Sequence, residues 1–120
     1  MEIKKEIKRE GYAVKITLAE NGAVLGWTYL YVMFQGRHRE PYGYLENVYV
    51  EPEHRGRGLG NKLVELAIAE ARERSCYKLI GTSKMEKTEV HEFYAKHGFA
   101  KMGYEFRLDL IKDSAVITKD

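Results

Sequence analysis

Three glycines alternate with other residues in the segment Arg55–Gly60, which reads Arg-Gly-Arg-Gly-Leu-Gly and precedes an amphipathic stretch. Glycine has no Cβ atom, so the backbone at Gly56, Gly58 and Gly60 can approach a ligand closely. The amides of the first turn of a helix lack intrahelical acceptors and lie at the positive end of its dipole. A glycine-rich loop at such a helix start is typical of an anion site, for example one for a phosphate group. The alternative is a glycine-rich turn between a strand and a helix that binds no ligand.

The segment differs from two common phosphate-binding motifs. It lacks the Gly-Lys-Ser/Thr of the P-loop, and Asn61 occupies the position of the last glycine of Gly-x-Gly-x-x-Gly. The residue pattern therefore predicts an anion-binding loop without identifying its ligand.

Hydrophobic patterning predicts the elements that position this loop. Residues 44–50 form a strand before it, and from Leu59 to about Arg74 the apolar residues make one wide helical stripe with charged residues opposite. Residues 77–81 are a short strand of the buried type. A second helical pattern, from Val90 to about His97, precedes Gly98, which is typical of a helix C-terminal cap.

Further strands are expected on either side of this region. Residues 11–18 and 23–34 are rich in β-branched and aromatic residues, and the Asn21-Gly22 pair between them favours a hairpin turn. Residues 99–111 predict two more strands. The charged segment around Ile3 and Ile7 is interpreted as an edge strand, with a helical turn as the alternative. The expected fold is α/β: a single domain, residues 1–120, with a mixed sheet of about six to seven strands and two main helices.

The composition excludes several classes of protein, among them dedicated nucleic-acid binders and membrane-spanning proteins. The 120 residues are 44% hydrophobic and 32% charged, which suits one folded domain, and the net charge of +2 is too small for a dedicated nucleic-acid binder. No apolar run approaches the roughly 20 residues of a membrane span. Cys76 is the single cysteine, and His91 and His97 lack the i, i+4 spacing of a helical metal pair. We therefore expect a cytoplasmic protein with no metal, nucleic-acid or membrane partner.

The loop and the second helix together resemble two motifs of the GCN5-related N-acetyltransferase (GNAT) family. Arg55-x-x-Gly58-x-Gly60, after a strand and at the start of a helix, is similar to that family's acetyl-CoA motif. Residues 92–99, Glu-Phe-Tyr-Ala-Lys-His-Gly-Phe, look like its Phe-Tyr-x-x-x-Gly-Phe signature. The two motifs follow in the family's order. The resemblance implies a GNAT-like fold with an acetyl-CoA-binding core of about residues 44–111.

The resemblance also implies how acetyl-CoA would be bound. The backbone amides of Arg55–Gly60 would hold the pyrophosphate, and the strand Val48–Val50 would pair with the pantetheine arm where it splays away from residues 77–81. A backbone amide near Val48 would hold the thioester oxygen. The implied coenzyme-binding residues are Val48, Tyr49, Val50, Arg55, Gly56, Arg57, Gly58, Leu59 and Gly60.

Two residues match catalytic positions of the family. A primary amine with a pKa of about 10.4 is almost wholly protonated at pH 7, so a group must accept its proton before it can attack a thioester. Glu46 lies where members of the aminoglycoside, polyamine and glucosamine-phosphate types carry an acid, and it could accept that proton or hold a cationic substrate. Tyr94 matches the usual proton donor to the departing thiolate. The alternatives are a surface carboxylate for Glu46, a core aromatic for Tyr94, and His91 or a water chain as the base.

The chain departs from the family at its beginning. Members usually have one or two helices between their first two strands, where this chain has only Asn21-Gly22. The acceptor site is therefore expected to be more open, or to be completed by residues 35–43, the C-terminal tail or a second subunit in a homodimer. The predicted function is an acetyl-CoA-dependent N-acetyltransferase that moves an acetyl group to a primary amine of a small molecule or peptide, by direct attack in a ternary complex. The alternative is a minimal acyl-CoA-binding module with a sensing or partner-docking role.

Overall fold

The computed structural model describes residues 1–112 and 114–117. It divides into two compact units, Met1–Gly81 and Thr82–Asp120. The first unit contains a mixed sheet of four strands in the order β1-β2-β3-β4, in which β3 and β4 are parallel and the other neighbours antiparallel. Its elements are β1 (Tyr12–Glu20), β2 (Ala23–Met33), β3 (Tyr42–Val50), the 3-10 turn η1 (Pro52–His54), α1 (Leu59–Glu73) and β4 (Leu79–Gly81).

A tight hairpin joins β1 to β2. Asn21 and Gly22 both have positive φ, 51° and 81°, as the two central residues of such a turn require. The strands pair from Tyr12 with Val32 to Glu20 with Ala23. The predicted hairpin is confirmed, and the chain between the first two strands has no room for a helix.

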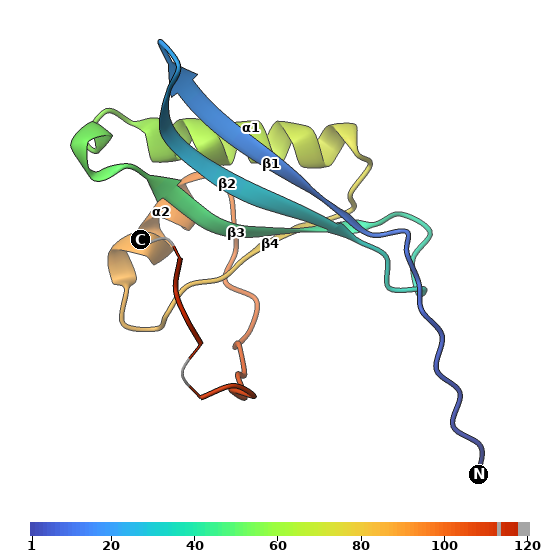
Figure 1. Cartoon of the computed structure of the whole chain (residues 1–120). Helices are drawn as coiled ribbons and strands as arrows, with labels where there is room; N and C mark the ends of the chain where they lie inside the picture. The colour runs from blue at the N-terminus through green and yellow to red at the C-terminus, as the bar shows by residue number, and fades with distance from the viewer. Residues whose placement is uncertain (113, 118–120) are drawn as a thin grey trace. The chain divides into compact units, whose positions relative to one another are not determined.

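The core of the first unit lies between α1 and one face of the sheet (Figure 1). Leu30 and Val32 of β2 pack there with Ala71, and Val14, Cys76 and Leu79 complete the cluster. The helix buries the side chains of Leu63, Val64, Ala67 and Ala71, which repeat every three or four residues. Burial also raises the pKa of the Cys76 thiol, as expected for a packed cysteine and not for a reactive one. No helix in the described ranges is both long and apolar enough to cross a membrane.

The second unit contains the helix α2 (Thr88–Lys96). At its end Gly98 adopts a φ of +92°, the Phe99 N–H donates to the Tyr94 carbonyl at 3.1 Å, and the Gly98 N–H donates to the Ala95 carbonyl at 3.0 Å. These two bonds define a Schellman motif, which usually places apolar side chains in contact across the helix end. The rings of Tyr94 and Phe99 meet there with centroids 5.1 Å apart. The spacing Phe-Tyr-x-x-x-Gly-Phe is therefore explained locally as a capped helix end.

The prediction of six to seven strands is wrong, because the described residues form four. Residues 99–111 have no strand, and beyond Phe99 their large apolar side chains are exposed, with Phe106 92% and Leu108 83% accessible. The segment before β1 is also irregular, and Ile3 and Ile7 are exposed. Alternation of apolar residues indicates which side chains a strand would bury, but a strand also needs a neighbour for its backbone hydrogen bonds. The sequence pattern carries no information about that neighbour.

Candidate functional site

Two hydrogen bonds fix the loop between β3 and α1 to the end of the sheet, and a third closes a turn within the loop. The Glu51 N–H donates to the Leu25 carbonyl at 2.8 Å, and the His54 N–H donates to the Glu51 carbonyl at 2.9 Å. Arg55 donates from Nε to the Val50 carbonyl at 2.8 Å, and its guanidinium lies 5.7 Å from the centre of the Tyr49 ring. Arg55 therefore holds the loop against β3, a structural role that its sequence motif does not reveal.

Two of the three glycines in the loop are required by backbone conformation. Gly56 and Gly58 have φ values of +85° and +76°, and a Cβ atom at either would meet no heavy atom within 4 Å. Side chains are strained in this left-handed region even where space is free. Gly60, by contrast, lies within the first turn of α1. Its helical backbone does not in itself require glycine.

The start of α1 keeps the positive character that an anion site needs. Gly58 is its N-cap residue, no side chain caps it, and the first turn contains no acidic residue. The first helical bond runs from the Lys62 N–H to the Gly58 carbonyl at 3.2 Å. The amides of Leu59 and Gly60, at the start of the helix, therefore have no carbonyl of the same helix to bind. No carboxylate of the first turn neutralises the helix dipole.

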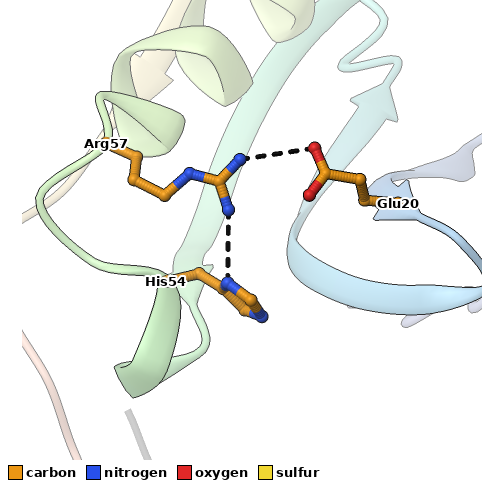
Figure 2. A network of polar contacts seen from close by, with 3 residues as sticks. All are labelled: Glu20, His54 and Arg57. Atoms are coloured by element: carbon orange, nitrogen blue, oxygen red, sulfur yellow. Dashed lines mark hydrogen bonds and ion pairs between the residues drawn. The ribbon is translucent and has the colours of Figure 1, made fainter.

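Arg57 adds a positive charge to the same loop. Its guanidinium pairs with Glu20 at 3.3 Å, from Nη2 to Oε2, and lies 3.2 Å from Nδ1 of His54 through Nη1 (Figure 2). Glu20 is the last residue of β1, so the hairpin end is tied to the loop. No local sequence pattern indicates this contact, because the two residues are 37 positions apart.

A β-bulge interrupts β3 in front of the loop. Glu46 pairs with Tyr29 and Tyr49 pairs with Trp27, so two residues, Asn47 and Val48, lie opposite the single residue Thr28 of β2. Asn47 has a φ of +57°. The fully buried Thr28 donates its hydroxyl to the Glu46 carbonyl at 3.2 Å. The bulge changes the direction of β3 at the residues that were expected to bind the thioester.

Beyond the bulge, β3 extends past the end of β4. The two strands pair over three residues, from Gly43 with Leu79 to Leu45 with Gly81. From Glu46 onward β3 continues to Val50 without a partner in β4. An edge of this kind offers backbone groups to an extended ligand. The pairing thus ends where the two strands were expected to separate.

Glu46 and Tyr49 lie on the face of the sheet opposite α1, together with Trp27 and Tyr29 of β2. The Tyr49 and Trp27 rings have centroids 5.4 Å apart, and the Tyr49 hydroxyl donates to Oε2 of Glu51 at 3.4 Å. Burial, and then the Glu51 carboxylate, raise the pKa of the Tyr49 phenol. Tyr49 is therefore a packed structural residue at the strand end, while Glu46 remains half-buried.

Tyr94 belongs to the second unit, where its ring packs against Phe93 and Phe99. His91, the alternative base, has its Nε2 atom 2.9 Å from the Lys84 carbonyl. Since a carbonyl can only accept, that nitrogen carries a proton and is engaged. The first unit thus brings together Glu46, Val48–Val50 and the glycine loop, and the second unit contains Tyr94.

A family model described as Acetyltransferase (GNAT) family matches residues 2–99. The chain belongs to this family. The resemblance in the two motifs is therefore confirmed, and GNAT acetyltransferases use acetyl-CoA as the acetyl donor.

Parts of the chain are similar in sequence to individual GNAT proteins. Glucosamine 6-phosphate N-acetyltransferase 1 of Oryza sativa subsp. japonica is 41% identical over 66 residues, which are 55% of this chain and 38% of that enzyme. Aminoalkylphosphonate N-acetyltransferase of Salmonella typhimurium is 27% identical over 86 residues, which are 72% and 56% of the two chains. The chain thus matches about half, or less, of the length of these relatives. A crystal structure of a Trypanosoma brucei acetyltransferase superposes with a TM-score of 0.74 at 31% identity, covering 82% of this chain and 69% of the other.

Proposed function

We propose that this GNAT protein transfers the acetyl group of acetyl-CoA to a primary amine of a small molecule, by direct attack in a ternary complex. The observation that carries the proposal is the continuous arrangement of bulge, free strand edge and glycine loop along β3 and the start of α1. The glycine loop at one end suits the pyrophosphate of CoA, and the Glu46 carboxylate at the other end suits the amine of the acceptor. The reaction of a CoA thioester with an amine needs both sites.

The residues present fit acetyl-CoA in two respects. The amides from Gly56 to Gly60 would hold the pyrophosphate, because the helix start is uncapped and no acid of its first turn competes for it. The edge of Val48–Val50 would pair with the amide groups of the pantetheine arm, because β4 ends before it. An amide near Val48 would then hold the thioester oxygen as negative charge develops on it.

Two side chains would move protons in this reaction. Glu46, at the bulge, would accept a proton from the ammonium form of the acceptor, directly or through a water molecule. Once neutral, the amine nitrogen attacks the thioester carbonyl and the C–S bond breaks. Tyr94 would donate its phenolic proton to the departing thiolate. His91 is the alternative base, and it would act through Nδ1, since its Nε2 atom donates to the Lys84 carbonyl.

Small amines are the acceptors favoured by the named relatives. The rice relative is named for glucosamine 6-phosphate and the Salmonella relative for aminoalkylphosphonates. Both names describe a primary amine in a small, anionic molecule. A screen for this chain should therefore contain amino sugars and short aminoalkyl compounds beside polyamines, amino acids and peptides.

Release of free thiol from acetyl-CoA, followed with this panel of amines, tests the proposal. We expect thiol release that depends on both the amine and the protein, with mass spectrometry showing one acetyl group on the acceptor and none on the protein. Acetyl-CoA binding by calorimetry without turnover of any amine would contradict the proposal. That result would favour the acyl-CoA-binding module, the function suggested by the short connection between β1 and β2.

A further inference from the structure

Four aromatic residues form a stripe on the face of the sheet opposite α1, which we call the aromatic face: Trp27, Tyr29, Tyr31 and Tyr44. Consecutive rings lie 5.6 Å, 5.9 Å and 6.4 Å apart between centroids. Because α1 packs on the other face and is the only α-helix of Met1–Gly81, no helix of this unit covers the stripe. All four residues keep at least part of their surface accessible.

Three residues on adjacent strands, Lys15, Tyr29 and Glu46, form a row across this face. Lys15 of β1 pairs with Tyr29, and Tyr29 pairs with Glu46, so a cation and an anion flank one tyrosine on three adjacent strands. The Nζ atom of Lys15 lies 5.3 Å from the centre of the Trp27 ring and 5.6 Å from that of Tyr29. With strands about 4.8 Å apart, the Cα atoms of Lys15 and Glu46 are separated by about 10 Å. The row is therefore long enough to hold a small molecule across Tyr29.

Neither end of the row is neutralised within the part of the chain that the structure describes. No carboxylate there lies within ion-pair distance of Lys15, and no cation lies within that distance of the Glu46 carboxylate. An exposed lysine is often simply solvated, but a half-buried carboxylate gains from a cationic partner because burial has removed part of its hydration. The faces of tyrosine rings also attract cations.

We infer that this row binds the acceptor, and that the acceptor carries an anionic group in addition to its amine. The amine would lie at Glu46, over the edge of the Tyr29 ring, and the anionic group would lie at Lys15. The ammonium of Lys15 faces the two rings on one side and has donors left for phosphate or carboxylate oxygens on the other. This inference rests on the proposed function, and it makes Lys15 a specificity-determining residue.

Matched acceptors provide the test. ω-Aminoalkyl phosphates, from aminoethyl to aminopentyl, would be compared with the corresponding ω-amino alcohols and with ω-amino acids, so that only the second group changes. We expect kcat/KM to favour the phosphates or the amino acids over the alcohols by about 3- to 10-fold, the range of a charge pair that is open to solvent. The stronger of the two anionic series identifies the type of anionic group that is bound.

Two variants of Lys15 and one control assign this preference to the row. Lys15→Gln should bring the ratio of anionic to alcohol acceptors close to one, and Lys15→Arg should restore it. Arg72→Gln removes an exposed positive charge from α1, on the other side of the sheet, and should leave the ratio unchanged. An equal ratio for the wild-type protein and Lys15→Gln, or a decrease in Arg72→Gln as large as that in Lys15→Gln, would overturn the inference.

Trp27 gives a second measurement that does not depend on turnover. It is the single tryptophan of the chain, and its ring is next to the Lys15 ammonium. Titration with aminopropyl phosphate should change its fluorescence in the wild-type protein, with at least about threefold weaker apparent binding in Lys15→Gln. A fluorescence change without acetylation of any amine would contradict the proposed function alone. Acetylation without preference for an anionic group, and without a response of Trp27, would contradict this inference alone.

Discussion

The buried hydroxyl of Thr28 donates a hydrogen bond to the carbonyl oxygen of Glu46, 3.2 Å away on the neighbouring strand. This bond lies at the point where β3 has one residue more than β2. It gives the backbone carbonyl next to the bulge a side-chain donor from the neighbouring strand. The backbone of the proposed general base is thus held in place from β2.

Removal of this hydroxyl should weaken both the fold and the reaction. In Thr28→Val the shape of the side chain is kept, but the hydrogen bond to the part-buried Glu46 carbonyl is lost, which costs about 1 to 2 kcal/mol of unfolding free energy. Urea unfolding measures this loss. The same change at Thr17, exposed on β1, is the control and should leave the free energy of unfolding within about 0.5 kcal/mol of the wild-type value. Equal stability of both variants would mean that the bond does not support the bulge.

The backbone conformation of Asn47 predicts that glycine is better tolerated than valine at this strand position, the reverse of the usual preference in strands. Its φ of +57° is easily adopted by glycine and tolerated by asparagine, but it is strained for a β-branched residue. Asn47→Gly should therefore be close to neutral, whereas Asn47→Val should destabilise the protein by about 1 to 2 kcal/mol, although valine favours ordinary strands. Thermal unfolding of the two variants measures the difference. A more stable Asn47→Val would show that β3 is regular at this position in solution.

Substitutions at Gly60 test whether the ligand, rather than the fold, requires glycine at this position. Gly60 lies within α1, where the helical backbone allows other residues, so we expect Gly60→Ala and Gly60→Val to fold, which thermal unfolding checks. If the pyrophosphate lies against this turn, the larger side chain should obstruct it and raise the Kd for acetyl-CoA at least tenfold, or about 1.4 kcal/mol. Gly60→Ala should have a smaller effect. Calorimetry with unchanged affinity in Gly60→Val would remove the anion site from this loop.

Tyr94→Phe tests the proposed acid. The variant keeps the ring that packs against Phe99 at the end of α2 and removes only the hydroxyl. We expect kcat to fall by about 10- to 1000-fold with little change in acetyl-CoA affinity, because only proton transfer to the leaving thiolate is lost. Stopped-flow thiol release measures kcat, and Phe93→Leu on the same helix is a control for packing. Wild-type turnover in Tyr94→Phe would leave Tyr94 with a structural role only.

Local sequence signals predicted the elements around the site well. The Asn21-Gly22 turn, the stripe of α1, and Gly98 as a helix cap each depend on residues close together in the chain, and the structure contains all three. The glycine loop was also located from neighbouring residues, but its glycines were interpreted as allowing close approach of a ligand, whereas Gly56 and Gly58 also adopt backbone angles that only glycine adopts without strain.

Features that depend on distant residues were missed. The bulge in β3 requires the register of β2, and Asn47, a residue that tolerates positive φ inside a strand, was its only local signal. The ion pair between Glu20 and Arg57 was missed for the same reason, because the two residues are far apart in the sequence. Residues 99–111 alternate like a strand, but the sequence does not show that they lack a neighbouring strand. Arg55 also has a structural contact that its motif did not indicate, from its Nε atom to the Val50 carbonyl, while its role in coenzyme binding stays a prediction.

Glu46→Gln should distinguish two roles of the carboxylate through the dependence of the reaction on pH. If Glu46 is the base, the variant keeps acetyl-CoA binding and loses turnover most strongly near neutral pH, where a primary amine with a pKa of about 10.4 is almost entirely protonated. As the pH rises toward that pKa, the free amine becomes abundant without a base, so the variant should recover part of its kcat/KM. The loss of kcat/KM in Glu46→Gln, relative to the wild-type protein, should therefore become smaller as the pH increases.

If Glu46 only anchors a cationic acceptor, the loss should appear instead in the KM of the acceptor, at every pH at which the amine is charged, with kcat little changed. Glu51→Gln, at the end of β3, is a matched control that removes a carboxylate only a few residues away. Initial rates of thiol release from about pH 6.5 to 10, at saturating acetyl-CoA, separate the two patterns, since that range approaches the pKa of the free amine from below. Wild-type kinetics of Glu46→Gln over the whole range would exclude both roles and make His91, through its Nδ1 atom, or a water chain the better candidate for the base.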